Sequence, residues 1–314
     1  MNQITQQQRY SIEALHGENY TQTAIAQRLG IHKSSVCREL ARNSSNGIYQ
    51  ANKAHKTAIS RCQPDSYKLM GVLLERVKSQ LKQQHSPEQI SGRLAQEQTA
   101  ITISHETIYQ WVYTDKKQGG TWYIHLRQAH KKRRRRLSGK DRRGIIPNKV
   151  MIAQRPPEVA AKTRLGDYEG DTIIGANHQG AIVTLVDRVS KTTLMVKVAT
   201  KSADLVSKAI IGLLKRAPIK AKTLTVDNGR EFTEHQKIAK AANCAVFFAN
   251  PYHSWERGLN ENTNGLIRQY IPKKTAFNQV SHHQVRAIER TLNNRPRKTL
   301  NYLSPTEFIQ QYQT

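Results

Sequence analysis

Apolar residues recur at helical spacing near the start of the chain. Ile25 and Leu29 lie four residues apart, Val36 and Leu40 repeat this spacing, and Gly30 stands between the two pairs. Side chains four residues apart share one face of an α-helix, and glycine commonly follows the last residue of a helix. The pattern therefore predicts a helix, a short turn and a second helix, which together form a helix-turn-helix unit.

The second of these helices is predicted to carry polar and basic side chains on its outer face. Such side chains can contact base edges and phosphates when a helix lies in the major groove of DNA. We therefore predict DNA contacts from His32, Lys33, Ser34, Ser35, Arg38 and Arg42. The alternative is a plain helical hairpin whose polar face meets only water.

A second helical pair is predicted over residues 86–113. Ser86 begins it, because Ser followed three residues later by Gln89 gives a capping box, and another helix is predicted to begin after Ser104. The inward apolar positions are Ile90, Leu94, Ile108 and Val112, and the outward candidates for DNA contacts are His105, Thr107, Tyr109 and Gln110. The loop between these helices is longer than in the first unit, so a helical spacer without DNA contacts is the alternative.

From residue 165 onward, runs rich in β-branched residues replace the helical spacing. Three strands joined by short turns are predicted, which is typical of an antiparallel meander, over residues 167–175, 180–188 and 191–199. The later elements are a helix, a strand, a helix, a strand and a helix, over residues 202–217, 223–226, 233–242, 245–248 and 260–270. This order is that of a ribonuclease-H-like α/β domain with a mixed five-stranded sheet. A last helix near 281–294 is predicted to close the core or to join subunits.

The net charge of the chain indicates what kind of partner it binds. Lys and Arg total 50 against 23 Asp and Glu, a net charge of +27. This excess indicates a polyanionic partner, with nucleic acid the first candidate and an anionic membrane surface the second. Nine Lys or Arg fall within residues 129–144, a block typical of a flexible arm that contacts DNA phosphates. The candidate contacts in this arm are Lys131, Lys132, Arg133, Arg134, Arg135 and Arg136.

The distribution of apolar residues and cysteines predicts the cellular compartment and the state of the thiols, and the succession of patterns predicts the domains. No apolar run approaches the roughly 20 residues that cross a bilayer, and the N-terminus lacks the apolar stretch of a secretory signal, so we expect a cytoplasmic protein with no membrane partner. Cys37, Cys62 and Cys244 lie far apart and fit reduced thiols better than a disulfide framework or a zinc cluster. The predicted plan is multidomain: a helix-turn-helix domain, a second helical domain, a basic linker and the α/β domain, at residues 1–60, 61–120, 121–158 and 159–314.

Three carboxylates of the α/β domain are placed where a metal site can gather them. Asp171 lies in the first predicted strand and Asp227 ends the fourth, and these strands are neighbours at the centre of a ribonuclease-H-like sheet. Adjacent carboxylates repel unless a cation lies between them, and oxygen ligands suit Mg²⁺ or Mn²⁺. Glu261, on the helix over 260–270, can supply the third carboxylate. Arg268 follows seven residues later on nearly the same helix face, where it can contact the DNA backbone.

Other carboxylates are weaker candidates for this site. They are Asp167, Glu169, Asp187, Glu231 and Glu256. Asp167 and Glu169 share the face of the strand that carries the first ligand but lie closer to the strand's start. Asp187 is interpreted as a hairpin residue, Glu231 as a support of its loop, and Glu256 precedes the last helix of the domain.

Five stretches of the sequence resemble the insertion-sequence-thirty (IS-thirty) family of bacterial transposases, within the superfamily of DDE transposases and retroviral integrases. HKSSVCRELARN resembles that family's first helix-turn-helix, and NNRPRKTLNYLSPTEF resembles its closing segment. GDYEGDTIIG, TVDNGREF and NPYHSWERGLNENTNGLIRQYIP resemble the blocks that hold its catalytic carboxylates, here Asp171, Asp227 and Glu261. The resemblance covers nearly the whole chain. Two departures, Tyr168 in place of a common tryptophan and the variant stretch 253–256, leave these three carboxylates intact.

The resemblance implies a bacterial enzyme that binds the terminal inverted repeats of its element and then cuts and joins DNA. Cleavage and strand transfer into target DNA would use two Mg²⁺ or Mn²⁺ ions per active site. It also implies a homodimer or a higher synaptic multimer, a circular intermediate, and action at the bacterial nucleoid. Two other functions stay open at this point: a DNA-binding repressor whose back half is accessory, and a ribonuclease-H-like nuclease that cuts without joining.

Overall fold

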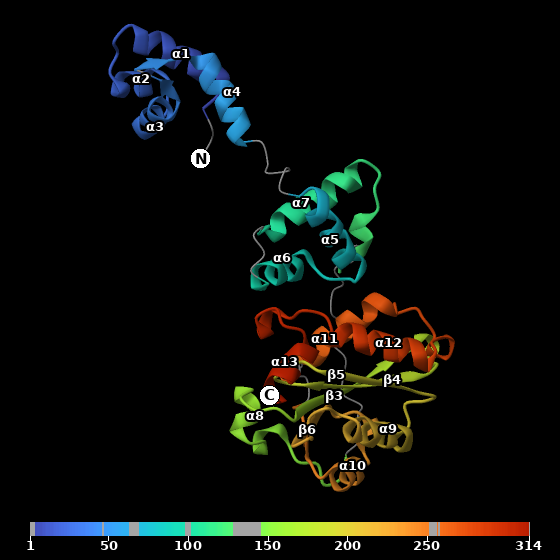
Figure 1. The fold of residues 1–314 in the computed structure, drawn as a ribbon. Helices are drawn as coiled ribbons and strands as arrows, with labels where there is room; N and C mark the ends of the chain where they lie inside the picture. Colours follow the sequence, from blue (N-terminus) through green and yellow to red (C-terminus); the bar gives the residue numbers. More distant parts are fainter. Residues whose placement is uncertain are drawn as a thin grey trace. The chain divides into compact units, whose positions relative to one another are not determined.

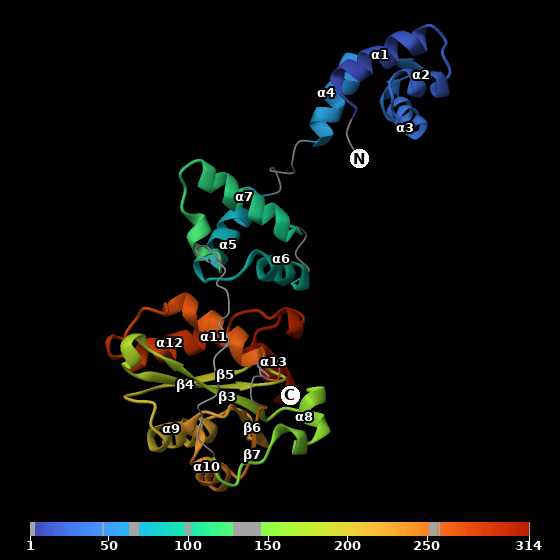
Figure 2. The same cartoon turned by 180° about the vertical axis from the view of Figure 1, so that it is seen from behind.

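The protein forms two compact units, Met1–Gly71 and Val72–Thr314. The structure is a computed structural model that describes residues 4–45, 47–62, 69–97, 102–127, 146–250, 256 and 258–313. Figures 1 and 2 show the elements of each unit from opposite sides. None of the helices in these parts of the chain is both long and apolar enough to traverse a lipid bilayer.

The first unit is helical, with one very short hairpin. Its elements are α1 (Gln6–Gly17), α2 (Gln22–Arg28), α3 (Lys33–Asn43), β1 (Ser44–Ser45), β2 (Ile48–Tyr49) and α4 (Ala51–Cys62). The predicted helix, turn and second helix are α2 and α3, and Gly30 between them has a φ of 62°. A residue with a side chain is strained at this φ, which explains the glycine. α1 and the hairpin are not among the elements predicted from the sequence.

The core of the first unit joins α1 to the helix-turn-helix. Ile12 of α1 packs with Ile25 of α2 and with Val36 and Leu40 of α3, and all four are buried. The predicted apolar faces therefore point inward. Beside this core, the guanidinium of Arg9 donates from Nε to Glu39 Oε1 at 2.7 Å, and both side chains are buried.

The second unit begins with three helices, α5 (Gly71–Lys82), α6 (Pro87–Gln96) and α7 (His105–Lys117), followed by a 3₁₀ turn at Trp122–His125. The predicted capping box is present, because Ser86 Oγ accepts from the Gln89 amide while Gln89 Oε1 accepts from the Ser86 amide. Ser104 caps α7 in the same way, with Oγ accepting from the Thr107 amide at 3.1 Å.

A mixed five-stranded sheet forms the centre of the rest of this unit. Its strands are β3 (Asp167–Ile174), β4 (Ala181–Asp187), β5 (Thr193–Val198), β6 (Thr223–Val226) and β7 (Ala245–Phe248), in the spatial order β5-β4-β3-β6-β7. β3, β4 and β5 form the predicted antiparallel meander, and β6 and β7 are added in parallel. The first and fourth strands of the domain, β3 and β6, are neighbours as predicted.

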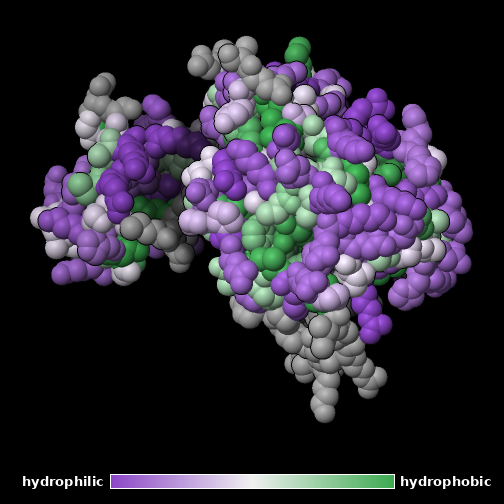
Figure 3. All heavy atoms as spheres, turned by 90° about the horizontal axis from the view of Figure 1, so that it is seen from below, coloured by the Kyte–Doolittle hydropathy of each residue, from purple (hydrophilic) through white to green (hydrophobic). Residues whose placement is uncertain are grey.

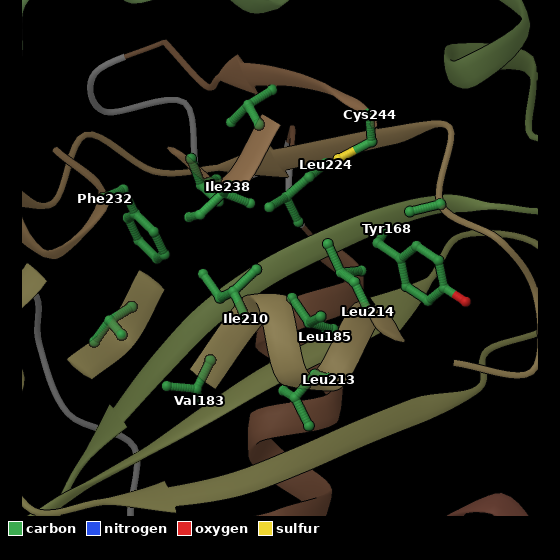
Figure 4. Packing of buried hydrophobic residues seen from close by; sticks show 14 of the residues in the cluster. Tyr168, Val183, Leu185, Ile210, Leu213, Leu214, Leu224, Phe232, Ile238 and Cys244 are labelled. Atoms are coloured by element: carbon green, nitrogen blue, oxygen red, sulfur yellow. The ribbon is translucent and has the colours of Figure 1, made fainter. Parts of the chain in front are cut away.

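Helices cover both faces of the sheet (Figures 1 and 2). On one side lie α9 (Ala203–Lys215) and α10 (His235–Ala242), and on the other α11 (Gly258–Tyr270) and α12 (His282–Asn293). Figure 4 shows Ile210, Leu213 and Leu214 of α9 packed toward the sheet residues Leu185 and Leu224. A second apolar cluster joins the opposite face to the α11 and α12 side chains, with Ile173, Ile182, Met195, Leu266, Ile267, Val285, Ile288 and Leu292. The helix predicted near 281–294 therefore closes the core.

The short helix α8 (Pro157–Ala161) precedes the sheet, and α13 (Pro305–Gln313) follows the chain segment after α12. That segment and α13 contact α6. Arg93 donates to both carboxylate oxygens of Glu307, at 2.8 and 2.6 Å, and Gln89 Nε2 donates to the Pro296 carbonyl at 2.8 Å. At Gly92, an added Cβ would lie 2.2 Å from the ring of Tyr302, so only glycine permits this close approach.

Candidate active site

Asp171 lies in the middle of the central strand, opposite Thr184 of β4. Successive side chains of a strand alternate between the two faces of the sheet. Tyr168 belongs to the cluster under α9, whereas Ile173 belongs to the cluster under α11 and α12. Asp171 has the same parity as Ile173, so its half-buried carboxylate projects toward α11.

Asp227 follows the last residue of β6. The register of β6 with β3 sets its position opposite that of Asp171. Parallel pairing of β3 with β6 sets Glu169 opposite Thr225, an offset of 56 residues (225 − 169). The same offset leads from Asp171 to Asp227, two residues beyond the last pair of the ladder and one residue beyond the end of β6. Neighbouring strands lie about 4.8 Å apart. The two acidic residues therefore occupy equivalent positions on adjacent strands.

Gly170 permits this close packing of the central strands. A Cβ added there would lie 3.1 Å from Val226 Cγ1, 3.2 Å from Leu224 Cδ1 and 3.3 Å from Leu185 Cδ2. These contacts come from both neighbouring strands, so a larger side chain would push against β4 and β6 together. The glycine immediately before Asp171 thus lets the side chains of β4 and β6 pack closely beside this part of β3.

Helix α11 runs along β3 and contacts it through amide side chains. Asn260 Nδ2 donates to the Gly170 carbonyl at 3.3 Å, and Asn264 Nδ2 donates to Asp171 Oδ2 at 2.8 Å. The other carboxylate oxygen of Asp171 accepts from the Thr172 amide at 2.9 Å. Glu261 is exposed in the first turn of α11, three residues before Asn264 and hence one helical turn away. The helix is predicted by the sequence, whereas the contact between Asn264 and Asp171 is not.

The loop after Asp227 holds a further carboxylate. Asp227 Oδ1 accepts from the Gly229 amide at 2.8 Å. A Cβ at Gly229 would lie 2.8 Å from that oxygen and 2.2 Å from Glu231 Oε2, so the two carboxylates flank this glycine. Glu231 is buried and is bound by Lys201 Nζ at 2.6 Å and by Thr172 Oγ1 at 2.8 Å. These contacts agree with its interpretation as a support of the loop.

The other carboxylates are held by neighbouring side chains or amides. Asp167 accepts from Arg164 and Thr223, and Glu169 is paired with Arg188. Asp187 accepts from three backbone amides and the Ser190 hydroxyl at the β4–β5 turn. Glu256 accepts from the amide and the side chain of Asn250.

The oxygen donors at Asp171 and Asp227 are chemically suited to a divalent hard cation. Their adjacent positions also supply the repulsion that a cation relieves. Within the described ranges, no group of three or more His, Cys, Asp or Glu lies close enough to hold a metal ion. Asp171 and Asp227 thus share the register of two paired strands, and the exposed Glu261 stands one helical turn from Asn264, whose amide contacts Asp171.

Arg268 lies farther along α11 and bonds to backbone. Its guanidinium donates to the Ile174 carbonyl at 2.8 Å and to the Pro272 carbonyl at 3.4 Å, and it lies over the ring of Phe277. Burial lowers the pKa of Arg268. These contacts fix the end of β3 against α11.

The DNA-contact candidates of α3 lie on its outer side. His32 caps the helix, with Nδ1 accepting from the Ser34 amide at 3.2 Å, and Arg38 Nε donates to the Ser34 carbonyl at 2.9 Å. Lys33, Arg38 and Arg42 are exposed, while Ser34 and Ser35 are half-buried. The helix therefore presents a polar, cationic face opposite its buried Val36 and Leu40.

The α7 candidates are also largely on the surface. His105 and Gln110 are exposed, Thr107 and Tyr109 are half-buried, and the Tyr109 ring stacks on Tyr113 with centroids 6.1 Å apart. Residues 131–136 of the predicted basic arm lie outside the described residues. Figure 3 shows that hydrophilic residues cover most of the face seen from below, as the excess of Lys and Arg leads one to expect.

Comparison with known proteins defines the class of the two parts. Residues 2–43 match the family model of a helix-turn-helix domain, and residues 164–254 match that of an integrase core domain. These ranges contain α2 and α3 in the first unit and all five strands of the sheet in the second. A DNA-binding domain is thus combined with the core of a polynucleotidyl transferase, as the order of elements predicted.

Whole-length relatives give the family. The chain is 44% identical over 312 residues to the transposase for insertion sequence element IS4351 of Bacteroides fragilis, covering 98% of this chain and 95% of the relative. It is 38% identical to the transposase for IS1086 of Cupriavidus metallidurans, and 36% identical to transposase InsI for IS30A of Escherichia coli K12, covering 94% and 83% of those proteins. The chain belongs to the insertion-sequence-thirty family of DDE transposases. Transposases of this class use divalent metal ions.

Proposed function

We propose that the protein binds the terminal inverted repeats of its insertion sequence and then cuts and joins DNA at Asp171, Asp227 and Glu261. The observation that carries this proposal is the parallel pairing of β3 with β6, whose register extends from Asp171 to Asp227, together with the hydrogen bond from Asn264 of α11 to Asp171. The exposed position of Glu261 on that helix supports its role as the third acidic residue. Polar and basic residues on the outer face of α3 support a role in reading the repeats.

The residues of the chain prepare this site in two ways. The Asn264 amide and the Thr172 amide each bind one oxygen of Asp171, and the Gly229 amide binds one oxygen of Asp227. These hydrogen bonds fix the orientation of the two carboxylates. Asp171, Asp227 and Glu261 would hold two divalent ions, Mg²⁺ or Mn²⁺. The chemistry such ions supply is activation of an attacking oxygen and stabilisation of the leaving 3′-oxygen in an in-line displacement.

DNA recognition in this proposal rests on charge and on multiple contacts. The excess of 27 positive charges favours double-stranded DNA, both the inverted repeats and the target. Bringing two ends together requires at least two copies, so we propose a homodimer or a higher synaptic multimer. The proposed setting is the bacterial cytoplasm, at the nucleoid.

The experiment is a joining assay with purified full-length protein, Mg²⁺, a labelled duplex carrying the inverted repeat, and a target plasmid. We expect joined products from the unmodified protein and none from Asp171→Asn, Asp227→Asn or Glu261→Gln. Glu158→Gln is the matched control, because Glu158 is an exposed carboxylate on α8. Cut but unjoined products would indicate a nuclease, and repeat binding with neither product would indicate a repressor. Full joining by Glu261→Gln would remove that residue from the site.

A further inference from the structure

A cavity of about 300 Å³ opens beside the candidate active site, at the start of α11. Gly258 and Leu259 of the first turn of α11 line it, together with Glu169 of β3. Glu169 stands two residues before Asp171 on the same face of the strand, and a strand rises about 3.3 Å per residue, so about 7 Å separate their positions. The cavity therefore borders the candidate active site without including its acidic residues.

The charged side chains that line this cavity are mainly cationic. They are Lys162, Arg188, Lys191, Arg297, Glu169 and Glu256. Four cations against two carboxylates leave an excess of two positive charges. Arg188 is paired with Glu169, and Glu256 accepts from Asn250, so both carboxylates already have partners. Besides this ion pair, the charges that line the cavity are Lys162, Lys191 and Arg297 against Glu256, an excess of two positive charges. The Lys191 ammonium also donates to the Arg188 carbonyl.

Arg297 is the strongest evidence for an anion. Its side chain is 9% exposed, its Nε has no hydrogen-bond partner among the residues that the structure describes, and its terminal nitrogen donates to the Leu292 carbonyl at 3.0 Å. Burial and the nearby Arg295 lower the pKa of Arg297 to about 10, so it stays charged at neutral pH. A buried guanidinium charge is costly without a counter-charge, and an anion in the cavity that Arg297 lines would lower that cost.

Two further features favour an anion at the same place. Burial is the main cause that lowers the pKa of Lys191 to about 8; the charge of Lys162 adds to this, and Asp187 and Glu169 act against it. A positive charge is therefore costly at this position, and a bound anion would stabilise it. The first turn of α11 adds backbone amides and the positive end of the helix dipole, which attract anions. α11 has 13 residues, long enough for this effect.

We propose that this cavity binds a phosphate group of the DNA backbone, through Arg297, Lys191 and Lys162 and the first turn of α11. The inference rests on the proposed function, because that function brings DNA to the neighbouring acidic residues. A phosphate held here would fix the strand relative to Asp171 without contacting it. The contact is to the backbone, so it carries no sequence information.

The test measures the salt dependence of DNA affinity for the full-length protein without divalent metal. Binding of the inverted-repeat duplex is followed by fluorescence anisotropy from 50 to 200 mM NaCl. Each phosphate contact contributes about 0.9 to the slope of log K against log salt. We expect Lys162→Gln/Lys191→Gln to lower the slope by about 0.9. Its affinity deficit relative to the unmodified protein should then shrink about three- to fourfold across this salt range.

Two more variants sharpen the result. Arg297→Gln should give the same change of slope, and if this buried substitution prevents folding the lysine pair decides the outcome. Lys240→Gln is the matched control, because Lys240 is exposed on α10 and does not line the cavity. Folding of each variant is checked by circular dichroism. Slopes for the folded lysine variant equal to that of the unmodified protein would overturn the proposal.

A free anion must be distinguished from DNA as the occupant. Melting temperatures are compared in inorganic phosphate and in chloride at equal ionic strength. Phosphate could stabilise the unmodified protein but not the lysine variant, while the salt slopes of DNA binding stay equal in the two proteins. That result would identify a site for free anions and overturn the DNA assignment. The slopes are also measured on a random-sequence duplex, where the same reduction is expected. Absence of joined products from the unmodified protein would refute the proposed function alone, since the slopes do not depend on joining.

Discussion

The buried ion pair between Arg9 and Glu39 should control the stability of the DNA-reading unit. Glu39 Oε1 and Oε2 accept from Arg9 at 2.7 and 3.3 Å, and the side chains are only 8% and 9% exposed. Glu39 Oε1 also accepts from the Tyr49 hydroxyl and the Asn43 amide, both at 2.9 Å. One carboxylate thus ties together α1, α3 and β2.

Glu39→Gln would leave the Arg9 charge buried without its counter-charge. Breaking such a pair from one side costs about 3–5 kcal/mol. A unit of 71 residues has roughly 4–10 kcal/mol of stability at 0.05–0.15 kcal/mol per residue. The substitution therefore removes a large part of the free energy of unfolding of this unit.

Amide hydrogen exchange within α3 measures this loss in the full-length protein. Since about 1.4 kcal/mol is a factor of ten, exchange through unfolding of the unit should accelerate roughly a hundredfold to a few thousandfold. Glu18→Gln, an exposed position at the end of α1, should change exchange by little. Binding of the inverted repeat should be lost at a lower temperature in Glu39→Gln.

A double replacement tests the reason for the loss. Arg9→Met with Glu39→Leu removes both charges, so it should cost less than Glu39→Gln alone, although Tyr49 and Asn43 still lose their acceptor. If Glu39→Gln exchanged like the unmodified protein, or if the double variant were the less stable of the two, the reasoning from buried charge would be wrong.

Two further predictions concern the second unit. Asn264→Leu removes the 2.8 Å hydrogen bond to Asp171. It should lower the rate of joining about ten- to a hundredfold and leave binding of the inverted repeat unchanged. An unaltered rate would exclude an orienting role for Asn264. The Arg93 guanidinium lowers the pKa of Glu307 from 4.5 to about 2, so their contact stabilises the fold above about pH 4.5 and weakens as pH falls through about 2. Thermal melts between pH 5 and pH 2 should show a loss of unfolding free energy of at most about 1 kcal/mol for this part-exposed pair. Glu307→Gln should not show this loss. Parallel pH profiles of the two proteins would contradict the prediction.

The elements set by local pattern could be predicted from the sequence. The capping box at Ser86 depends on residues three positions apart, and the strand order depends on a succession of short periodic runs. The pairing of β3 with β6 then followed from the fold class. This was enough to place Asp171 and Asp227 on neighbouring strands, and the pairing of those strands is confirmed.

Side-chain contacts between residues far apart in the sequence could not be predicted. The contacts that hold α1 join Arg9 to a residue 30 positions away, and no periodicity records such a pair. Asn264 faces Asp171 because Leu266 and Ile267 fix the rotation of α11 by packing under it. The charged cavity likewise gathers residues from the end of α8, where Lys162 follows the helix, from the β4–β5 turn and from the segment after α12, and only the folded chain brings these together.

The contact of α6 with the segment after α12 joins residues 206 to 214 positions apart. On a ribosome that adds about 5–20 residues per second, α6 would wait some 10 to 40 seconds for this partner. During that interval Gln89 and Arg93 lack their partners from the C-terminal segment, Pro296 and Glu307. Assembly of this part of the molecule is therefore deferred to the last stage of translation, and a nascent chain interrupted before residue 295 would carry α6 without its binding surface.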